Sequence, residues 1–380
     1  MAIGCEVSFE LFDFRTDVNI LQISSASSFG GGERYVADLT NSLTDRGHVV
    51  YAAVRPRSPL IRHLRLPDER VLTLPLRNAL DVQSAHALDR FVRRQRIEVV
   101  HAHMARDYSL ASYAARRNRQ TKFIATRHVL FELSRVHRHT LSRAARVIAV
   151  SQAVARELRS QGIVEEGKIA TVPNGIDVDR FARACAGFDR AQFLRRMGLP
   201  SDCALVGSVG ELRTLKRHDD FIRASARVAK EFPQAHFVLA GVDATGEVQQ
   251  QLEKLVGELG LTDRFHFLGW VDESEALLCA MDVFVSASET ESFGLAIVEA
   301  MAARTAVVAT RTEGAQEVID DQKTGMLVPV GDVEAIAGSV CELLGNTETS
   351  RRMGRHAQEI AHARFSLRRM VDEIETLYLN

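Results

Sequence analysis

The chain alternates short, mostly apolar runs of strand length with amphipathic helical stretches. Runs such as Val18–Ser24 and Ala204–Gly210 have the apolar character of strands that are buried on both faces. Helical patterns follow them, for example Ser84–Arg96, in which apolar residues recur every three or four positions. Strands joined by helices pair in parallel, because the helix returns the chain to the same end of the sheet. The alternation therefore predicts the α/β class, with parallel sheets covered by helices on both faces.

The alternation runs twice, with an interruption between the two sets. The pattern loosens over residues 178–200 and restarts at Ala204. The chain has 380 residues, whereas one domain usually holds roughly 100–200. We therefore predict two doubly wound domains, residues 1–183 and 184–364, followed by a helical segment, 365–380. Ligands of such sheets bind beyond the carboxyl ends of the strands, so we expect one cleft between the two domains.

A glycine-rich turn lies between the first predicted strand and the first helix. Gly30, Gly31 and Gly32 leave backbone N–H groups free for a phosphate. The turn is not a dinucleotide fingerprint, because Tyr35 stands where the third glycine of G-x-G-x-x-G would be. A tight turn without a ligand is the alternative.

Two cations, Arg213 and Lys216, follow a predicted strand of the second set and precede a helix. Positive charges at a strand end suit a diphosphate, because they neutralise charge that develops on a leaving group. Solvated charges at the start of a helix are the alternative interpretation.

The segment from Val283 to Gly314 combines two carboxylates with a helix start. A strand, a polar loop, the turn at Phe293-Gly294 and a helix from Leu295 are predicted in that order. The helix would direct its free N–H groups and positive end at the loop. Glu291 in the loop and Glu299 in the helix could form the acid/base pair of a glycosidase. The nearby cations favour the other interpretation, in which a carboxylate binds ribose hydroxyls.

Two histidines, His103 and His128, follow separate strands of the first set. Neither has a metal-ligand spacing such as H-E-x-x-H, so no metal site is predicted. We expect them to form hydrogen bonds with a sugar or an acceptor hydroxyl, with a purely structural role as the alternative.

Bulk properties indicate a protein of the cytoplasm. The five cysteines are scattered without a C-x-x-C pair, which favours reduced thiols. No apolar run reaches the roughly 18 residues of a membrane helix, and the first residues lack the basic region of a signal peptide. Net charge is −1, but the first half is basic, including the stretch Arg135–Arg143. That half would face an anionic acceptor or the inner face of an anionic membrane, with an exposed helix face as the alternative. No nucleic-acid partner is expected.

Several blocks together resemble the retaining GT-B glycosyltransferases of family 4. The block ETESFGLAIVEAMAARTAVVAT resembles the family's E-x7-E signature, and GGGERYVADLTNSLTDRGHVV resembles its N-terminal glycine loop and helix. Further blocks agree in order and spacing: VVHAH, ATRH, VIAVSQAV, VPNGIDVDRF, VGELRTLKRHDDFIRA, FVLAGVD, FHFLGWVDE and TGMLVPVGD. The resemblance extends over nearly everything after residue 17.

The resemblance implies the GT-B fold, in which two Rossmann-like domains face a central cleft. The second domain would hold a nucleotide-sugar donor, with UDP or GDP expected. The first would hold a glycan, lipid-linked or small-molecule acceptor, and the last helix would cross back onto it. The implied activity is hexosyl transfer with retention, without a cofactor or metal, in glycan synthesis such as that of lipopolysaccharide or polysaccharide.

The resemblance also implies roles for single residues. Glu299 would bind the ribose, Glu291 would lie at the reacting side of the donor sugar, and the backbone at Phe293, Gly294 and Leu295 would hold the sugar or phosphates. Lys216 would bind the diphosphate together with Arg213, and Gly31 and Gly32 would close on it. His128 would approach the sugar and, with His103, the acceptor. The remaining donor contacts fall at strand ends: Gly210, Gly241, Gly269 and Val271.

The sequence departs from the family pattern at a few positions. Glu211 stands where the family commonly has arginine, and Arg213 would replace it. The other departures replace a proline or glycine of the family: Arg217, Ala287, Ser292 and Arg304. Both carboxylates remain, so we expect an active enzyme. A related GT-B epimerase or phosphorylase, or a non-catalytic protein that binds sugar nucleotides, are the alternatives.

Overall fold

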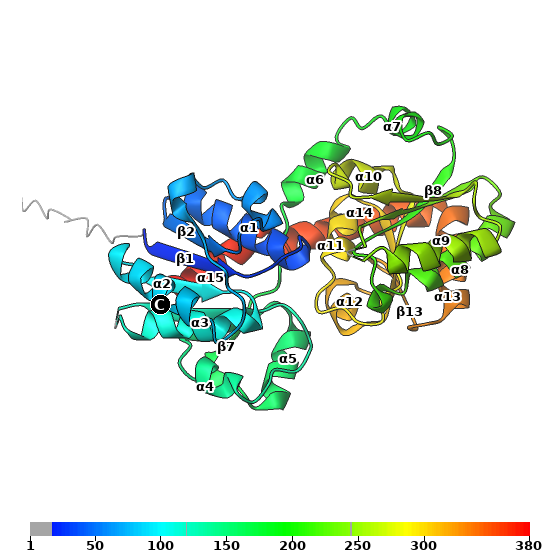
Figure 1. The fold of residues 1–380 in the computed structure, drawn as a ribbon. Coiled ribbons are helices and arrows are strands. Elements are labelled where there is room, and N and C mark those ends of the chain that lie inside the picture. Colours follow the sequence, from blue (N-terminus) through cyan, green and yellow to red (C-terminus); the bar gives the residue numbers. More distant parts are fainter. Residues whose placement is uncertain (1–16, 119, 244) are drawn as a thin grey trace, which may run out of the picture.

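A computed structural model describes residues 17–118, 120–243 and 245–380. The predicted extension before the first strand, which includes Cys5, lies outside the described residues. Figure 1 shows two lobes, one built from the first half of the chain and one from the second, with the last helix lying in the first lobe. Each lobe contains one sheet of parallel strands, as the alternation predicts.

In the described residues, the first domain has a seven-stranded parallel sheet with the order β3-β2-β1-β4-β5-β6-β7. Its strands are β1 (Asn19–Ser24), β2 (Val49–Val54), β3 (Val71–Thr73), β4 (Val99–Ala102), β5 (Lys122–Arg127), β6 (Arg146–Ala149) and β7 (Ile169–Thr171). Ile20 of β1 pairs with Val50 on one side and Val99 on the other. The chain thus winds outward from β1 in both directions, which is the doubly wound arrangement.

Helices cover both faces of this sheet. They are α1 (Gly31–Asp45), α2 (Val82–Arg94), α3 (Ala105–Arg116), α4 (His137–Leu141) and α5 (Gln152–Gln161), with the 3-10 turns η1 (Pro59–His63), η2 (Asp68–Arg70) and η3 (Glu166–Lys168). Separate apolar clusters lie on the two faces: α2, α3 and α5 contribute to one, and α1 contributes to the other.

The second domain repeats the plan. Its described strands form a six-stranded parallel sheet with the order β10-β9-β8-β11-β12-β13. They are β8 (Ala204–Val209), β9 (Ala235–Ala240), β10 (Phe265–Gly269), β11 (Val283–Ser286), β12 (Ala306–Thr310) and β13 (Met326–Val328). The helices, with one 3-10 turn, are α6 (Val178–Cys185), α7 (Arg190–Arg196), η4 (Thr214–Lys216), α8 (His218–Glu231), α9 (Glu247–Glu258), α10 (Ser274–Ala280), α11 (Leu295–Ala302), α12 (Glu313–Val318), α13 (Val333–Gly345) and α14 (Thr347–Arg364).

The chain enters the second domain earlier than residue 184. Val178 and Phe181 of α6 belong to the apolar cluster that also holds Ile297 of the second domain. The loosened stretch of the sequence contains two short helices, α6 and α7, whose starts are capped by the side chains of Asp177 and Asp189. Both aspartates are ordinary N-cap signals. We therefore place the crossing near residue 176.

The last helix, α15 (Leu367–Leu379), returns to the first domain (Figure 1). Ser366 caps its start and forms a bridge with Ile176, so the chain crosses the cleft twice at one place. Met370, Ile374 and Tyr378 of α15 are buried in the cluster that α1 and β1 form. The first domain is therefore completed by residues from the far end of the described chain.

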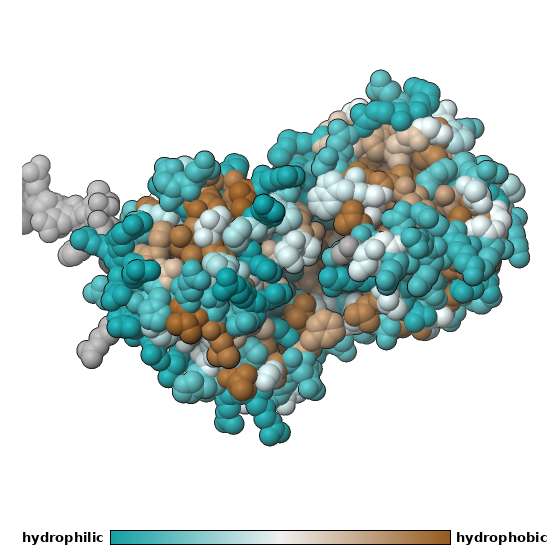
Figure 2. Space-filling view, viewed as in Figure 1, coloured by the Kyte–Doolittle hydropathy of each residue, from teal (hydrophilic) through white to brown (hydrophobic). Residues whose placement is uncertain are grey.

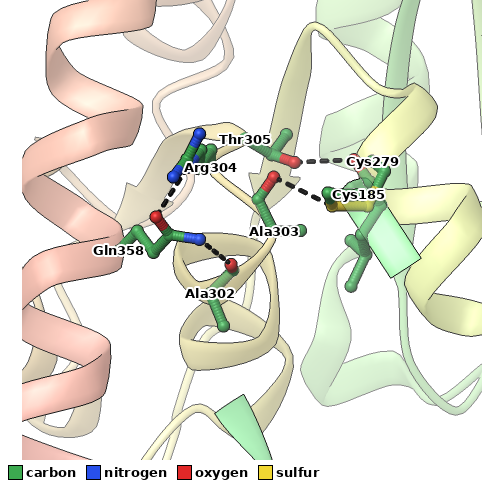
Figure 3. The surroundings of a disulfide bond; sticks show 8 residues. Cys185, Cys279, Ala302, Ala303, Arg304, Thr305 and Gln358 are labelled. Carbon is green, nitrogen blue, oxygen red and sulfur yellow. Dashed lines mark hydrogen bonds between the residues drawn. A yellow bond between two sulfur atoms is a disulfide. The ribbon is translucent and has the colours of Figure 1, made fainter. Parts of the chain in front are cut away.

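The expectation that all cysteines are reduced is wrong for one pair. Cys185 of α6 and Cys279 of α10 form a disulfide, shown in Figure 3. The two cysteines are 94 positions apart in sequence, and only the packing of α6 on α10 brings them together. Cys203 and Cys341 are free. None of the helices described is both long and apolar enough to cross a membrane.

Candidate active site between the two domains

A cavity of about 360 Å³ lies between the domains and is lined by both. Figure 2 shows the surface hollowed between the two lobes. The first domain contributes the glycine turn before α1, the residues after β5, and Asn174; the second contributes the ends of β8, β9, β10 and β11 and the start of α11. The cleft expected from the strand ends therefore exists.

Two helix starts meet at this cavity. Gly30, Gly31 and Gly32 lie at the start of α1, and Gly294, Leu295 and Ala296 lie at the start of α11. The two starts are close, since a Cβ atom on Gly31 would lie 2.9 Å from Cδ1 of Leu295. The first N–H groups of a helix have no acceptor within that helix, and its start carries partial positive charge. Both domains thus direct the positive end of a helix at the same space, and at α1 the Glu33 carboxylate accepts from the Gly30 N–H at 2.9 Å.

Lys216 and Glu291 form an ion pair at the wall of the cavity. The Nζ atom of Lys216 lies 2.5 Å from Oε1 of Glu291, and the Ser288 hydroxyl donates to the same oxygen at 2.9 Å. The side chains keep 29 % and 15 % of their exposure, respectively. A bound anion would therefore compete with Glu291 for the lysine.

Glu299 lies one turn into α11 and is almost completely buried. Burial raises the pKa of Glu299, and the guanidinium groups of Arg34 and Arg180 oppose that rise in pKa. Arg34 belongs to α1 of the first domain and also lines the cavity. The charge on Glu299 is therefore partly balanced from across the cleft.

His128 directly follows β5 and lines the cavity. Burial, with a smaller contribution from Arg127, lowers the pKa of His128 to about 3, so the ring is neutral near pH 7. Its Nε2 atom is buried and has no hydrogen-bond partner among the described residues. The ring packs edge-on against Tyr35, with centroids 4.7 Å apart. A fixed, neutral imidazole with a free nitrogen can donate or accept one hydrogen bond with a hydroxyl.

The strand ends of the second domain supply backbone to the cavity. Gly210, Gly241, Gly269 and Val271 all line it. The N–H of Gly241 donates to the carbonyl of Gly269 at 2.8 Å, and the N–H of Gly210 donates to that of Ala240 at 2.9 Å. These bonds extend the sheet beyond the strands, so the loops lie side by side at its edge.

Two predicted site residues do not line the cavity. The guanidinium of Arg213 pairs with Glu211 at 2.9 Å, and its side chain is 63 % exposed. Arg213 therefore lies outside the cavity and pairs with the glutamate that stands in the position of the family arginine. His103 is buried behind His128, where its Nε2 lies 2.8 Å from Oε1 of Gln22. Burial holds the pKa of His103 well below its usual range, and only 4 % of the residue is exposed, so it lies in the core outside the cavity.

Other residues line the cavity although the sequence did not single them out. Trp270, 46 % exposed, approaches Phe29 of the first domain edge-on at 6.0 Å. His218 also lines the cavity; burial lowers its pKa to about 4. Trp270 lies between two predicted donor contacts, Gly269 and Val271, which was the available signal. For His218 the only signal in the sequence was its position shortly after Lys216. The described part of the chain holds no group of three or more potential metal-ligating side chains.

Comparison with known proteins agrees with this architecture. A family model for "Glycosyltransferase Family 4" matches residues 29–180, and one for "Glycosyl transferases group 1" matches residues 189–360. The N-acetyl-alpha-D-glucosaminyl L-malate synthase of Bacillus anthracis is 29% identical over 309 residues, which cover 78% of each chain. The lipopolysaccharide core biosynthesis glycosyltransferase LpsE of Rhizobium meliloti (strain 1021) is 26% identical over 352 residues, covering 90% of this chain and 94% of LpsE.

A solved structure shows the same fold. Alr3699/HepE of Anabaena, crystallised in complex with UDP, superposes with a TM-score of 0.82 at 22% identity, covering 95% of this chain and 100% of HepE. The two family models match one domain each and meet between residues 180 and 189, close to the crossing in the structure. This chain therefore belongs to the GT-B glycosyltransferases, as a family 4-like protein.

Proposed function

We propose that this protein transfers a hexosyl group from a nucleoside diphosphate sugar to a hydroxyl group, with retention at the anomeric carbon. The observation that carries the proposal is a cavity into which both domains direct a helix start, with Lys216 and two carboxylates in its wall. A diphosphate matches the helix starts and the lysine. A sugar nucleotide extends that anion at both ends, toward Glu299 and toward Glu291.

The residues divide the donor between them in this proposal. Glu299, buried beside Arg34, accepts hydrogen bonds from the ribose hydroxyls. The N–H groups at the start of α11 and the Lys216 ammonium hold the diphosphate. When the diphosphate draws Lys216 away, Glu291 keeps the Ser288 hydroxyl and is free to face the donor sugar.

Transfer in this arrangement breaks the bond between the anomeric carbon and the diphosphate oxygen. The acceptor oxygen bonds to the anomeric carbon on the same face, and its proton passes to the departing diphosphate oxygen. The two helix starts and Lys216 stabilise the negative charge that develops there, so these groups supply positive charge without a metal. Neutral His128 donates or accepts one hydrogen bond at the sugar or the acceptor.

The acceptor approaches from the first domain. The two relatives reported above are named for an L-malate product and for lipopolysaccharide core biosynthesis. Their names point to a small hydroxy acid and to a growing glycan as the two acceptor classes to test. A glycan on a lipid would bring the basic first half to an anionic membrane surface, which flotation with anionic and neutral vesicles tests.

The test begins with the nucleotide. Trp270 is the chain's only tryptophan and lies in the cavity wall, so its fluorescence reports binding there without a label. UDP and GDP are titrated first, then their sugars. A genuine donor also raises the melting temperature by mass action. The proposal fails if no nucleoside diphosphate or its sugar changes the fluorescence or the melting temperature.

Turnover separates transfer from the alternatives. Release of nucleoside diphosphate that requires a hydroxyl acceptor indicates a glycosyltransferase. Release that requires phosphate indicates a phosphorylase, and conversion of the donor sugar without an acceptor indicates an epimerase. Binding without turnover over the donor and acceptor panels would favour a non-catalytic protein. The anomeric configuration of the isolated product, read by NMR, decides retention.

A further inference from the structure

Two acidic residues of α12 cross the cleft and bind α5 of the first domain. The Glu317 carboxylate accepts hydrogen bonds from the backbone N–H of Gln152, at 2.8 Å, and of Ala153, at 3.4 Å. One turn earlier in α12, Glu313 forms an ion pair with Arg156, one turn further along α5. Two contacts one turn apart fix both the position and the direction of α12 relative to α5.

The contact supplies acceptors to free backbone N–H groups at the start of α5. Ser151 caps this helix, but its hydroxyl accepts only from the N–H of Val154, at 3.1 Å. The N–H groups of Gln152 and Ala153 have no acceptor within the helix, and the positive end of the helix favours a negative charge. Glu317 supplies that charge from the other domain. Hydrogen bonds to a carboxylate are roughly twice as strong as those between neutral groups.

The backbone of α12 also touches the loop that carries Glu291. The N–H of Gly314 donates to the Glu291 carbonyl at 3.0 Å. A Cβ atom on Gly314 would lie 2.6 Å from the backbone nitrogen of Phe293 and 2.7 Å from the Glu291 carbonyl. No side chain separates α12 from this loop, so a displacement of α12 is passed to Glu291 and to the start of α11.

The other end of the contact leads to His128. Helix α5 follows β6, which pairs with β5 directly before His128. The N–H of Val150 donates to the Arg127 carbonyl, and the N–H of Asn174, which lines the cavity, donates to the Val150 carbonyl. The contact between α5 and α12 therefore joins the backbone next to His128 to the backbone next to Glu291.

We propose that Glu317 is a positioning residue for sugar transfer. Its bond to the start of α5, aligned by the pair of Glu313 with Arg156, holds the cleft closed and sets the Glu291 loop opposite His128. Glu317 does not line the cavity, so it acts through the loop. The kinetic consequence rests on the proposed transfer activity; the structural consequence does not.

The first experiment compares Glu317→Ala with Glu317→Gln and with Glu359→Ala. Glu359 is an exposed acid of α14 and controls for the loss of one charge. We expect Glu317→Ala to lower kcat about tenfold, the effect of losing one or two charge-assisted hydrogen bonds. Its affinity for UDP or GDP should change less than threefold, since the second domain holds the nucleotide. Glu317→Gln keeps an oxygen acceptor and should recover part of kcat.

The second experiment swaps charges. Arg156→Glu and Glu313→Arg each place like charges opposite one another, and the double variant restores an opposite pair. We expect small-angle scattering to show a larger radius of gyration for Glu317→Ala and for each single swap, and the parent value for the double swap. Equal radii for the parent and Glu317→Ala, or a double swap no better than its singles, would overturn the proposal. If no substrate pair gives turnover, scattering still decides whether the contact closes the cleft.

Discussion

Replacing Gly294 by alanine tests whether the start of α11 binds a diphosphate. Gly294 has φ of +94°, a left-handed conformation that costs other residues about 1–2 kcal/mol. An alanine also restricts the unfolded chain, which stabilises the folded state by about 0.4–1 kcal/mol. The net cost from the backbone is then about 1 kcal/mol. The added Cβ would lie 3.0 Å from Cδ1 of the buried Ile297, so the turn must shift slightly.

The shift moves the N–H groups that would face the diphosphate. Losing one or two hydrogen bonds to a charged group costs about 1.5–3 kcal/mol each, so UDP or GDP should bind at least about tenfold more weakly. Calorimetric titration measures the affinity, and thermal unfolding measures stability. A loss of about 1 kcal/mol lowers the melting temperature by about 2–4 °C for domains of this size.

Gly246→Ala is the matched control. Gly246 caps α9 with φ of +80°, has no atom within 4 Å of the added Cβ, and lies outside the cavity lining. It should lose similar stability and keep full nucleotide affinity. If both variants bind the nucleotide like the parent, the start of α11 does not hold the diphosphate.

Three further predictions concern charge, redox state and pH. Lys216→Met should weaken binding of UDP about tenfold or more but leave uridine binding nearly unchanged, because the proposed site uses Lys216 as a charged contact to phosphate; equal losses in calorimetry would contradict this. A reductant should lower the free energy of unfolding by about 2–4 kcal/mol, since the disulfide of Cys185 with Cys279 constrains a long segment of the unfolded chain; a Cys185→Ser variant should not respond. Burial lowers the pKa of His101 to about 3, so the unfolded imidazole, with a pKa near 6.5, takes up a proton first and stability falls as pH drops below 6.5. Between pH 7 and 5, the free energy of unfolding of His101→Gln should therefore fall by about 2 kcal/mol less than that of the parent, as measured by denaturant titration. If the free energy of unfolding depends on pH identically in both proteins, His101 is not the group responsible.

Most of the fold was predictable because periodicity alone decides it. An apolar run in the sequence indicates each buried strand, and the helices between the strands require the strands to pair in parallel. The two short helices between the domains were missed because their apolar faces are brief. Asp177 and Asp189, which cap them, were the signals that local sequence did offer.

The glycine positions of the family pattern show what a structure adds. Arg217 and Arg304 stand where the resemblance places glycine, and they have φ of +48° and +62°. The backbone thus keeps its left-handed turns even though the side chains have changed. Arg304 also donates to Gln358 of α14 at 2.5 Å (Figure 3), a contact that glycine would not make.

The site was predictable only in part. His103 and His128 carry the same local signal, a histidine after a strand, yet one is buried behind the other. Which of them reaches the cleft depends on how each strand ends, which periodicity does not specify. The same holds for Arg213 and Lys216: three positions apart, one pairs with Glu211 and the other with Glu291. Lys216 meets Glu291, 75 positions along the chain, only where the assembled sheet edge brings the two loops together.

The return of α15 to the first domain determines when that domain can finish folding during translation. Within the buried network of that domain, the Tyr378 hydroxyl lies 2.6 Å from Nδ1 of His101 and 3.2 Å from Nε2 of Gln22. A ribosome makes residues 17–175 long before it makes Tyr378. Until then the nascent domain exposes the apolar surface that α15 covers and leaves two polar side chains without their partner. The first domain is thus completed only after the whole second domain has been synthesised, because α15 follows that domain in the chain.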